Sequence, residues 1–346
     1  MTHATRGASP LRLAAIDIGT NSVKLLVGDV VQDRVRTATF ARETTRLGGE
    51  LGEARHILRA PLEATARVVA RFAGRARRDG ATDVTVFATH TLRVARNALR
   101  VQHILSRAAG TNVRVLSGRT EARWACAGAL SAIGRVRPSA VVFDIGGGSV
   151  EVVAIRGRQV ASVASRRLGA LALARRFLAT DPPGDAEFAR LDHHVCSVIR
   201  RWFEGLAQSG LAEEGSPHGG QACRLRAGGA QRLRTRGRAS WPAARLDLVA
   251  SGGAATVAAS MCGVHPGPGA RALKRSELLV LLHRARHLPL ARRAHMRGLP
   301  ADHADIIVPG LLVALRMVEA LGKRTVQVSP GGVREGALIE RARSSR

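Results

Sequence analysis

Runs of apolar residues alternate with short polar turns from the start of this chain, and this pattern predicts strands. The apolar segments at 13–17 (LAAID) and 23–30 (VKLLVGDV), joined by a short polar turn, predict a β-hairpin. The run VTVFAT at 84–89 is typical of a buried strand, and VRVLS at 113–117 predicts another. The first part of the chain therefore contributes several strands to a sheet.

Segments with apolar positions at helical spacing lie between these strands. They occur at 54–79, interrupted by Pro61, and at 93–108. Near the end of the chain, a helix is predicted around 303–320, followed by a strand at 325–329, a glycine turn and a final helix. Strands that alternate with helices indicate an α/β fold with a largely parallel sheet.

One short motif occurs twice. DIGTNSV at 17–23 and DIGGGSV at 144–150 share Asp, Ile, Gly, Ser and Val in register, at an offset of 144 minus 17, or 127 residues. Each copy follows an apolar strand and precedes another, which favours two related domains that each offer one polar hairpin turn. A chance match of five residues is the alternative. We expect the domains to span 1–135 and 136–346.

Both of these turns have the composition of a phosphate-binding loop. An Asp ends the strand in each copy, and small residues follow, whose backbone N–H groups can converge on an anion. No G-K-[ST] follows, so neither turn is a Walker loop, and two ordinary tight turns are the alternative. The predicted phosphate-binding residues are Thr20, Asn21 and Ser22 in the first turn and Gly146, Gly147, Gly148 and Ser149 in the second.

Three carboxylates lie beside the predicted phosphate sites: Asp17, Asp144 and Glu151. They would repel a phosphorylated substrate unless a hard cation such as Mg²⁺ lay between them, so they are the candidate metal ligands. The alternative for Asp17 and Asp144 is that each accepts hydrogen bonds from its own turn.

Two further residues could meet an anion. SGRTEAR at 117–123 follows a strand and begins a helix, where backbone donors and the helix dipole favour anions. Glu121 lies in the first turn of that helix, and a helix-stabilising acid is its ordinary role. Arg93 could pair with phosphate, whereas an exposed arginine at a helix start is the alternative.

The charge balance is strongly basic. There are 54 Lys and Arg residues against 26 Asp and Glu, a formal net charge of +28, which attracts polyanions. A compositional bias towards Ala and Arg would have the same effect without selection for binding. Residues 215–246, Gly-rich with seven arginines and no acid, are predicted to form a basic surface insertion that contacts a phosphate chain or is merely solvated. Nucleic acid is a less favoured partner.

Nothing in the sequence indicates a disulfide framework, a zinc site or a membrane segment. The four cysteines, Cys126, Cys196, Cys223 and Cys262, are far apart and form no C-x-x-C pair. The N-terminus lacks the apolar core of a signal peptide, and no apolar run approaches the ~20 residues that cross a bilayer. We therefore expect a cytoplasmic protein.

The motifs together resemble the exopolyphosphatase and guanosine pentaphosphate phosphatase family, in its short, two-domain form. The resemblance implies two actin-like (ribonuclease-H-like) domains with a cleft between them and a final helix that packs back on the first domain. A homodimer is a further expectation from the family. The segments that carry the resemblance are AIDIGTNSVKLLV, ATHTLR, SGRTEAR, FDIGGGSVEVV, SRRLGAL, ASGGAAT, ADIIVPG and VREGAL, in this order along the chain.

The resemblance also implies a reaction. The second Glu of the family's S-G-x-E-E-A segment is its proposed catalytic base, and Glu121 is at that position. The base would activate water for in-line attack on a terminal phosphoryl group bound with Arg93 and Mg²⁺. This chain departs from the family at Thr120, which replaces the first Glu, at His303, where an Arg is common, and at Pro330.

Three functions are consistent with these residues. The first is removal of terminal phosphates from inorganic polyphosphate. The second is hydrolysis of the 5′ γ-phosphate of guanosine pentaphosphate, against which the scarcity of aromatic residues (3%) argues mildly. The third is binding of polyphosphate or nucleic acid without turnover, which the departures from the family at Thr120 and His303 suggest.

Overall fold

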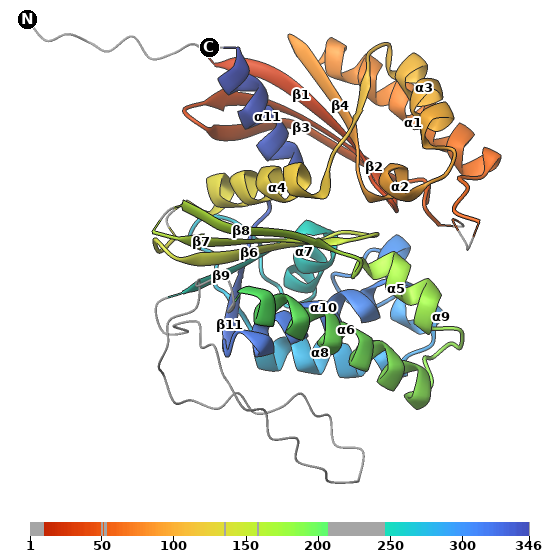
Figure 1. Ribbon diagram of the computed structural model, residues 1–346, viewed down its shortest axis with the longest axis vertical. Coiled ribbons are helices and arrows are strands. Elements are labelled where there is room, and N and C mark those ends of the chain that lie inside the picture. The colour runs from red at the N-terminus through yellow and green to blue at the C-terminus, as the bar shows by residue number, and fades with distance from the viewer. Residues whose placement is uncertain are drawn as a thin grey trace, which may run out of the picture.

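The structure is a computed structural model that describes residues 10–49, 51, 54–134, 136–157, 159–206 and 246–345. These residues form two α/β halves, one above the other in Figure 1, each built on one sheet. The predicted basic insertion at 215–246 lies outside the described residues, apart from Leu246 at its end.

The first sheet has five strands in the order β3-β2-β1-β4-β5. β1 and β2 form the predicted hairpin, β3 extends it on the outer edge, and β4 and β5 run parallel to β1. β3 was not predicted, because its polar and apolar residues show no clear pattern on an exposed edge. The strands are β1 (Leu11–Ile18), β2 (Ser22–Val31), β3 (Arg34–Thr44), β4 (Asp83–Ala88) and β5 (Val113–Val115).

The helices of the first half differ from the sequence-based expectation in two details. α1 (Arg59–Arg78) is not interrupted at Pro61, because Pro61 lies in its first turn, where the missing N–H has no helical partner to lose. The helix predicted at 93–108 is divided into α2 (His90–Val94) and α3 (Ala98–Ala109).

The second sheet repeats the plan of the first. In its order β10-β11-β9-β6-β7-β8, the run β8-β7-β6-β9-β11 matches β3-β2-β1-β4-β5 strand for strand, with the same antiparallel hairpin followed by parallel strands. Two actin-like domains are therefore present, as the resemblance implied. The strands are β6 (Ala140–Ile145), β7 (Val150–Arg156), β8 (Gln159–Arg166), β9 (Asp247–Ser251), β10 (Leu273–Lys274) and β11 (Thr325–Val328).

The helices of the second half pack around one almost completely buried helix, α10, which contacts α5, α6, α7 and α8. None of the helices in the described ranges combines the length and the apolar character needed to span a membrane. The helices are α5 (Ala170–Phe177), α6 (Asp185–Leu206), α7 (Gly252–Met261), α8 (Arg275–His287), α9 (Leu290–Arg293), the 3-10 helix η3 (Ala301–His303) and α10 (Ile307–Ala320).

Two helices cross between the halves. α4 (Gly118–Ile133) follows the last strand of the first sheet but packs on the second, where Cys126 contacts the cluster around Val142. α11 (Val333–Ser344) follows the last strand of the second sheet but packs on the first, where Leu338 joins the cluster around Leu26. Figure 1 shows α4 between the two sheets, with α11 passing upward beside it.

Glycines bring the crossed helices into direct backbone contact. A Cβ atom on Gly128 of α4 would lie 1.9 Å from the carbonyl oxygen of Gly332, and one on Gly336 of α11 would lie 1.9 Å from that of Trp124. Any side chain at either position would push the helices apart. This helix pair is the structural link that sets the position of one half against the other.

Candidate active site

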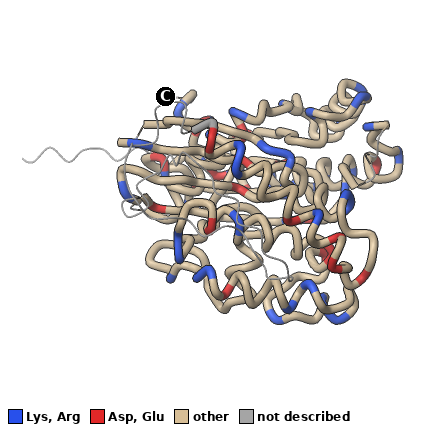
Figure 2. Tube along the Cα trace, turned by 60° about the horizontal axis from the view of Figure 1, so that its bottom comes forward, with Lys and Arg blue, Asp and Glu red and all other residues tan. Residues whose placement is uncertain are grey.

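A cleft of about 770 Å³ lies between the two halves. Its lining includes both predicted phosphate turns, Glu121 at the start of α4, and residues from β3, η3 and the N-terminal end of α11. Lys and Arg positions are distributed along the trace of both halves (Figure 2), so the net charge alone does not mark a binding face. The site is defined by the groups that line the cleft.

The two turns have the same local structure. The N–H of Gly19 donates to the carbonyl oxygen of Ser22 (3.1 Å), and the N–H of Gly146 donates to that of Ser149 (3.0 Å). The turns also face each other, because a Cβ on Gly147 would lie 3.3 Å from the Cβ of Thr20. The repeated motif of the sequence thus forms two like hairpin turns that meet in the cleft.

The glycine turn is braced from behind by the segment that begins α5. The N–H of Ala170 donates to the carbonyl oxygen of Gly146 (2.9 Å), and the N–H of Leu171 donates to that of Gly147 (3.0 Å). A Cβ on Gly169 would lie 2.2 Å from the carbonyl carbon of Gly148, so this close approach requires glycine. The sequence offered SRRLGAL as part of the resemblance, without this role.

Glu121, which lines the cleft, forms an ion pair with Arg93. Arg93 is held by the carbonyl oxygen of Leu116 (Nη1 to O, 3.0 Å) and reaches the hydroxyl of Ser149 (Nη2 to Oγ, 3.5 Å). Burial raises the pKa of Glu121 well above its ordinary value, and the nearby Glu151 raises it further, while Arg93 opposes both. Glu121 therefore holds a proton more readily than an ordinary glutamate.

Thr120, the departure beside this base, takes part in a helix cap and does not line the cleft. Its N–H donates to the hydroxyl of Ser117 (3.1 Å), and the two hydroxyls lie 2.9 Å apart. Ser117 is thus the N-cap of α4, and Thr120 is the residue whose N–H it satisfies.

Asp144 and Glu151 lie directly opposite each other in the β6–β7 hairpin. Ser149 and Ser165 donate to one oxygen of Glu151 (2.7 and 2.8 Å), and Ser251 donates to Asp144 (2.5 Å). Burial, together with Asp144, raises the pKa of Glu151 to about 7 against the opposing serine bonds. The pair is thus a site where added positive charge would be strongly favoured.

Asp17 has a different environment, because Lys24 lies directly opposite it in the β1–β2 hairpin. Burial raises the pKa of Asp17, and Lys24 lowers it. One oxygen of Asp17, Oδ1, is buried with no hydrogen-bond partner among the described residues. The three predicted metal ligands therefore differ in their surroundings: Asp144 and Glu151 lie opposite each other, whereas Asp17 lies opposite a lysine.

The hard oxygen donors of Asp144 and Glu151 suit Mg²⁺, which binds proteins through one or two carboxylates and completes its shell with water and phosphate. No group of three or more His, Cys, Asp or Glu side chains in the described ranges is arranged to hold an ion without such help. The pair consequently fits a cation that is shared with substrate.

Further cations line the cleft that sequence reasoning did not single out: Lys24, Arg34, Arg42 and Arg334. The guanidinium of Arg334 lies 4.9 Å from the ring centre of Phe40, whose surface is 53% exposed. Lys24 and Arg334 belong to the quoted motifs VKLLV and VREGAL, so those motifs were the available signal. Arg34, Arg42 and Phe40 were missed together with β3.

Ion pairs join the halves at the mouth of the cleft. Arg42 of β3 pairs with Asp302 and contacts Nδ1 of His303 (2.9 Å), and Arg46 pairs with Asp305 (2.7 Å). Burial would raise the pKa of Asp302, but the Thr44 hydroxyl bond and the Arg42 charge outweigh it and lower the pKa to about 2. His303, the second departure, is thus part of the contact between the domains.

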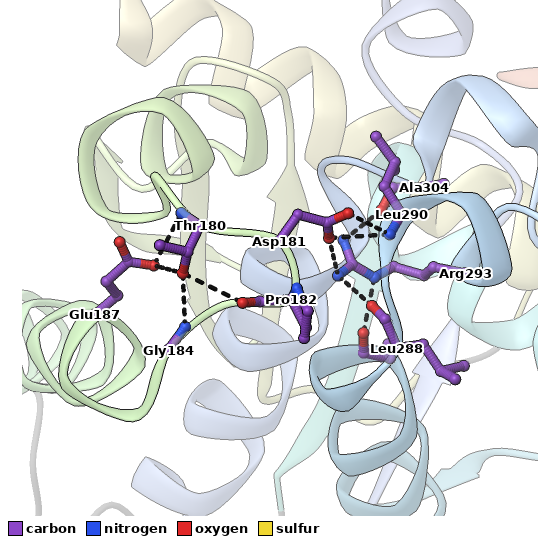
Figure 3. Close-up of polar contacts among 10 residues, drawn as sticks. Thr180, Asp181, Pro182, Gly184, Glu187, Leu288, Leu290, Arg293 and Ala304 are labelled. Atoms are coloured by element: carbon purple, nitrogen blue, oxygen red, sulfur yellow. Dashed lines mark hydrogen bonds and ion pairs between the residues drawn. The ribbon is translucent and has the colours of Figure 1, made fainter.

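The segment that carries Asp302 and His303 is fixed by Arg293, which is buried (Figure 3). Arg293 donates to the carbonyl oxygens of Leu288 (2.7 Å) and Ala304 (3.1 Å) and pairs with Asp181 (3.3 Å). Asp181 in turn accepts from the N–H of Leu290 (2.7 Å). This network ties α9 and the end of η3 to the loop before α6, next to His303, which lines the cleft.

Comparisons with known proteins find similar sequences along almost the whole chain. Exopolyphosphatase 1 of Mycobacterium tuberculosis (strain ATCC 25618 / H37Rv) is 27% identical over 343 residues, covering 96% of this chain and 88% of the relative. Exopolyphosphatase 1 of Mycobacterium leprae (strain TN) is 28% identical over 336 residues, covering 96% and 89%.

Solved structures agree with the fold. The crystal structure of the Aquifex aeolicus member of the Ppx/GppA family superposes with a TM-score of 0.71 at 22% identity, covering 97% of this chain and 99% of that one. An exopolyphosphatase from Cytophaga hutchinsonii gives a TM-score of 0.78 at 18% identity, covering 96% and 98%. A model of the Ppx/GppA phosphatase family matches residues 26–217 and 231–345, and the chain therefore belongs to this family, whose members hydrolyse phosphoanhydride bonds.

Proposed function

We propose that the protein is an exopolyphosphatase that removes terminal phosphates from inorganic polyphosphate. The observation that carries the proposal is the position of the buried Glu121–Arg93 pair, which reaches Ser149 of the glycine turn in a cleft between two like phosphate turns. A terminal phosphate held by the N–H groups of these turns would meet a carboxylate and a guanidinium at once.

In the proposed reaction, Glu121 accepts the proton of a water molecule that attacks the terminal phosphorus. Its raised pKa supports this role, because the carboxylate of an acid with a raised pKa accepts a proton more readily than that of an ordinary glutamate. Arg93 stabilises the charge that spreads over the equatorial oxygens during transfer. The phosphate contacts are assigned to the backbone and side chains of Thr20, Asn21, Ser22, Gly146, Gly147, Gly148 and Ser149.

Asp144 and Glu151 are the residues we assign to Mg²⁺, with Asp17 as a more distant third carboxylate partly balanced by Lys24. The cation would neutralise charge on the phosphate oxygens and on the departing chain. The pKa of Glu151, raised to about 7, supports this assignment, since a bound cation would stabilise the carboxylate form.

The remaining cations of the cleft support a long polyanionic substrate. Lys24, Arg42 and Arg334 line the same cleft as the catalytic pair, and Arg34 lies on its β3 wall. A chain whose terminal phosphate reached Glu121 would meet positive charge along the rest of the cleft, which favours chain binding over binding of a single phosphate.

One observation favours guanosine pentaphosphate as a second candidate substrate. Phe40 is an exposed aromatic ring on the wall of the cleft, and Arg334 lies over it, which is the type of platform on which a purine base stacks. A Phe40→Ala variant distinguishes the candidates, because it would weaken hydrolysis of the nucleotide and leave that of tripolyphosphate unchanged.

The contacts of Thr120 and His303 weaken the argument for a protein that binds polyphosphate or nucleic acid without hydrolysing it. Thr120 lies in the first turn of α4, where its N–H donates to the Ser117 hydroxyl, and His303 contacts Arg42, so neither departure removes a group from the Glu121–Arg93 pair.

The test is release of inorganic phosphate by the purified protein from tripolyphosphate, long polyphosphate and guanosine pentaphosphate, with and without Mg²⁺. Metal-dependent release from polyphosphate that is lost in Glu121→Gln is the expected result. Release from the nucleotide alone would replace the substrate in our proposal, and tight binding of polyphosphate without any release would overturn it.

A further inference from the structure

His90, the first residue of α2, lines the cleft but has no part in the mechanism above. A Cβ atom on Gly148 would lie 2.4 Å from Cδ2 of His90 and 2.5 Å from the hydroxyl oxygen of Thr20. The imidazole therefore contacts the glycine turn on one side and lies close to the first phosphate turn. Both turns belong to the proposed binding site for the terminal phosphate.

The ring nitrogens of His90 make no hydrogen bond that the described part of the structure records, although the ring borders the cleft. This distinguishes His90 from His303, whose Nδ1 contacts Arg42 (2.9 Å). A polar group that lines a cleft without a protein partner is free to bind a ligand or water. At this place the ligand would be the phosphate that the two turns hold.

The charged groups that face His90 are both cations. They are Arg93, on the same helix, and Arg167, in the segment between β8 and α5, while the two turns contribute the uncharged Thr20 and Gly148. Burial and, to a lesser extent, the two guanidinium groups lower the pKa of His90 to about 4, so the ring is neutral at physiological pH. An arriving phosphate chain would reverse this field, because its negative charges favour a protonated imidazole.

We propose that His90 is a further ligand of the terminal phosphoryl group, and that it takes up a proton from solvent when a phosphate chain enters the cleft. This inference rests on the proposed function, since it assumes that the turns bind the end of such a chain. Its consequence is that the site gains positive charge only when the anion is present.

The experiment measures binding of imidotriphosphate, a tripolyphosphate analogue whose bridging N–H groups resist hydrolysis, by calorimetry. Titrations in two buffers with different ionisation enthalpies give the number of protons taken up, and their repetition between about pH 6 and about pH 8 gives the pH dependence of Kd. The protein is compared with His90→Asn, His90→Ala and the control His103→Asn, an exposed residue of α3.

On binding the analogue, wild type and His103→Asn should each take up more protons than His90→Asn. We expect this difference to be a fraction of a proton that approaches about one at acidic pH. Their affinity should rise by roughly 10-fold more than that of His90→Asn as the pH falls. His90→Ala, which also loses the hydrogen bond, should bind about 10-fold more weakly than His90→Asn across the range.

Identical proton uptake and pH dependence in wild type and His90→Asn, with tight binding in both, would overturn this inference and leave the proposed function intact. Failure of wild type to bind the analogue would overturn both. Equal affinity of His90→Ala and His90→Asn for the analogue would contradict a direct hydrogen bond between the side chain at position 90 and the phosphate.

Discussion

Lys24 occupies in the first hairpin the position that Glu151 occupies in the second. Each lies directly opposite the Asp that precedes the turn, Asp17 in one case and Asp144 in the other. The two like turns therefore have opposite charge balance: an acid with a base on one side of the cleft, and two acids on the other. The duplicated framework thus provides an acid–base pair on one wall, where burial and Arg334 lower the pKa of Lys24 and Asp17 opposes them, and a place for an added cation on the other.

Glu121→Gln should lower kcat by about 10²- to 10⁴-fold and change KM little, because the amide fills the same space but cannot accept a proton. In wild type, the activity should rise with pH through a pKa well above that of an ordinary glutamate, since only the carboxylate form is a base. Steady-state kinetics on tripolyphosphate across pH check both statements. Glu340→Gln, on the exposed face of α11, is the matched control, and a similar loss there would point to a general defect.

Glu151 should make the metal-free protein less stable as the pH rises. Its folded pKa of about 7 exceeds the unfolded value of about 4.3, so its neutral form stabilises the fold below the unfolded pKa, and this contribution is lost as the pH rises through 7. The free energy of unfolding of Glu151→Gln, relative to wild type, should therefore increase by roughly 2–4 kcal/mol between about pH 4 and pH 8.

Urea denaturation of both proteins at the two pH values, in a chelator, measures this difference. Addition of Mg²⁺ near pH 8 should stabilise wild type and leave Glu151→Gln almost unaffected, because the variant lacks one of the two carboxylates assigned to the cation. If Mg²⁺ stabilised wild type and Glu151→Gln equally, Glu151 would not be a ligand of the cation.

The ion pairs at the cleft mouth should control how far the domains open. Replacement of both Asp302 and Asp305 by Asn removes the acidic partners of Arg42 and Arg46. These pairs are partly exposed, so we expect little change in unfolding free energy but a larger radius of gyration and a higher KM. Small-angle scattering provides the measurement.

High salt should bring wild type towards the behaviour of this double variant, because salt screens exposed pairs. Asp83→Asn, which removes a surface pair with Arg341 of α11 away from the cleft lining, is the control. An unchanged radius of gyration in the double variant would show that the crossed helices alone hold the domains.

Gly128→Ala should destabilise the whole protein by about 1–3 kcal/mol or more, since the added methyl group would meet the carbonyl oxygen of Gly332 at 1.9 Å. Gly267→Ala is the control, because an added Cβ there has no neighbour within 4 Å. Denaturant unfolding of the two variants gives the comparison. A loss of stability that is equal in both would mean that the close approach of α4 and α11 is not the cause.

The sequence predicted those parts of the fold and site that depend on local pattern. The hairpins and their turns follow from apolar runs joined by small polar residues, and the repeat of DIGTNSV as DIGGGSV corresponds to a repeated strand order. The family resemblance pointed to Glu121 as the candidate base. Its position in the first turn of a helix would by itself have indicated only a helix-stabilising acid. β3 was missed because an exposed edge strand buries too little to impose a pattern.

Other features depend on contacts that no local pattern records. Lys24 reads as one polar position in an apolar strand, and only the register places it opposite Asp17. The bracing of the glycine turn by Gly169, and the contact of Arg42 with Asp302, join segments that are far apart in the chain. The exchange of sheets by α4 and α11 is of the same kind, because each helix has the sequence of an ordinary covering helix.

That exchange makes the boundary near residue 135 a poor place to divide the molecule. A fragment that ended there would keep α4, whose apolar face matches the missing second sheet, and would leave uncovered the face of its own sheet that α11 normally occupies. The complementary fragment would carry the reverse defect. Expressed apart, the two pieces should aggregate; expressed together, they should find each other and rebuild the cleft, which makes this chain a natural candidate for a split, self-assembling enzyme.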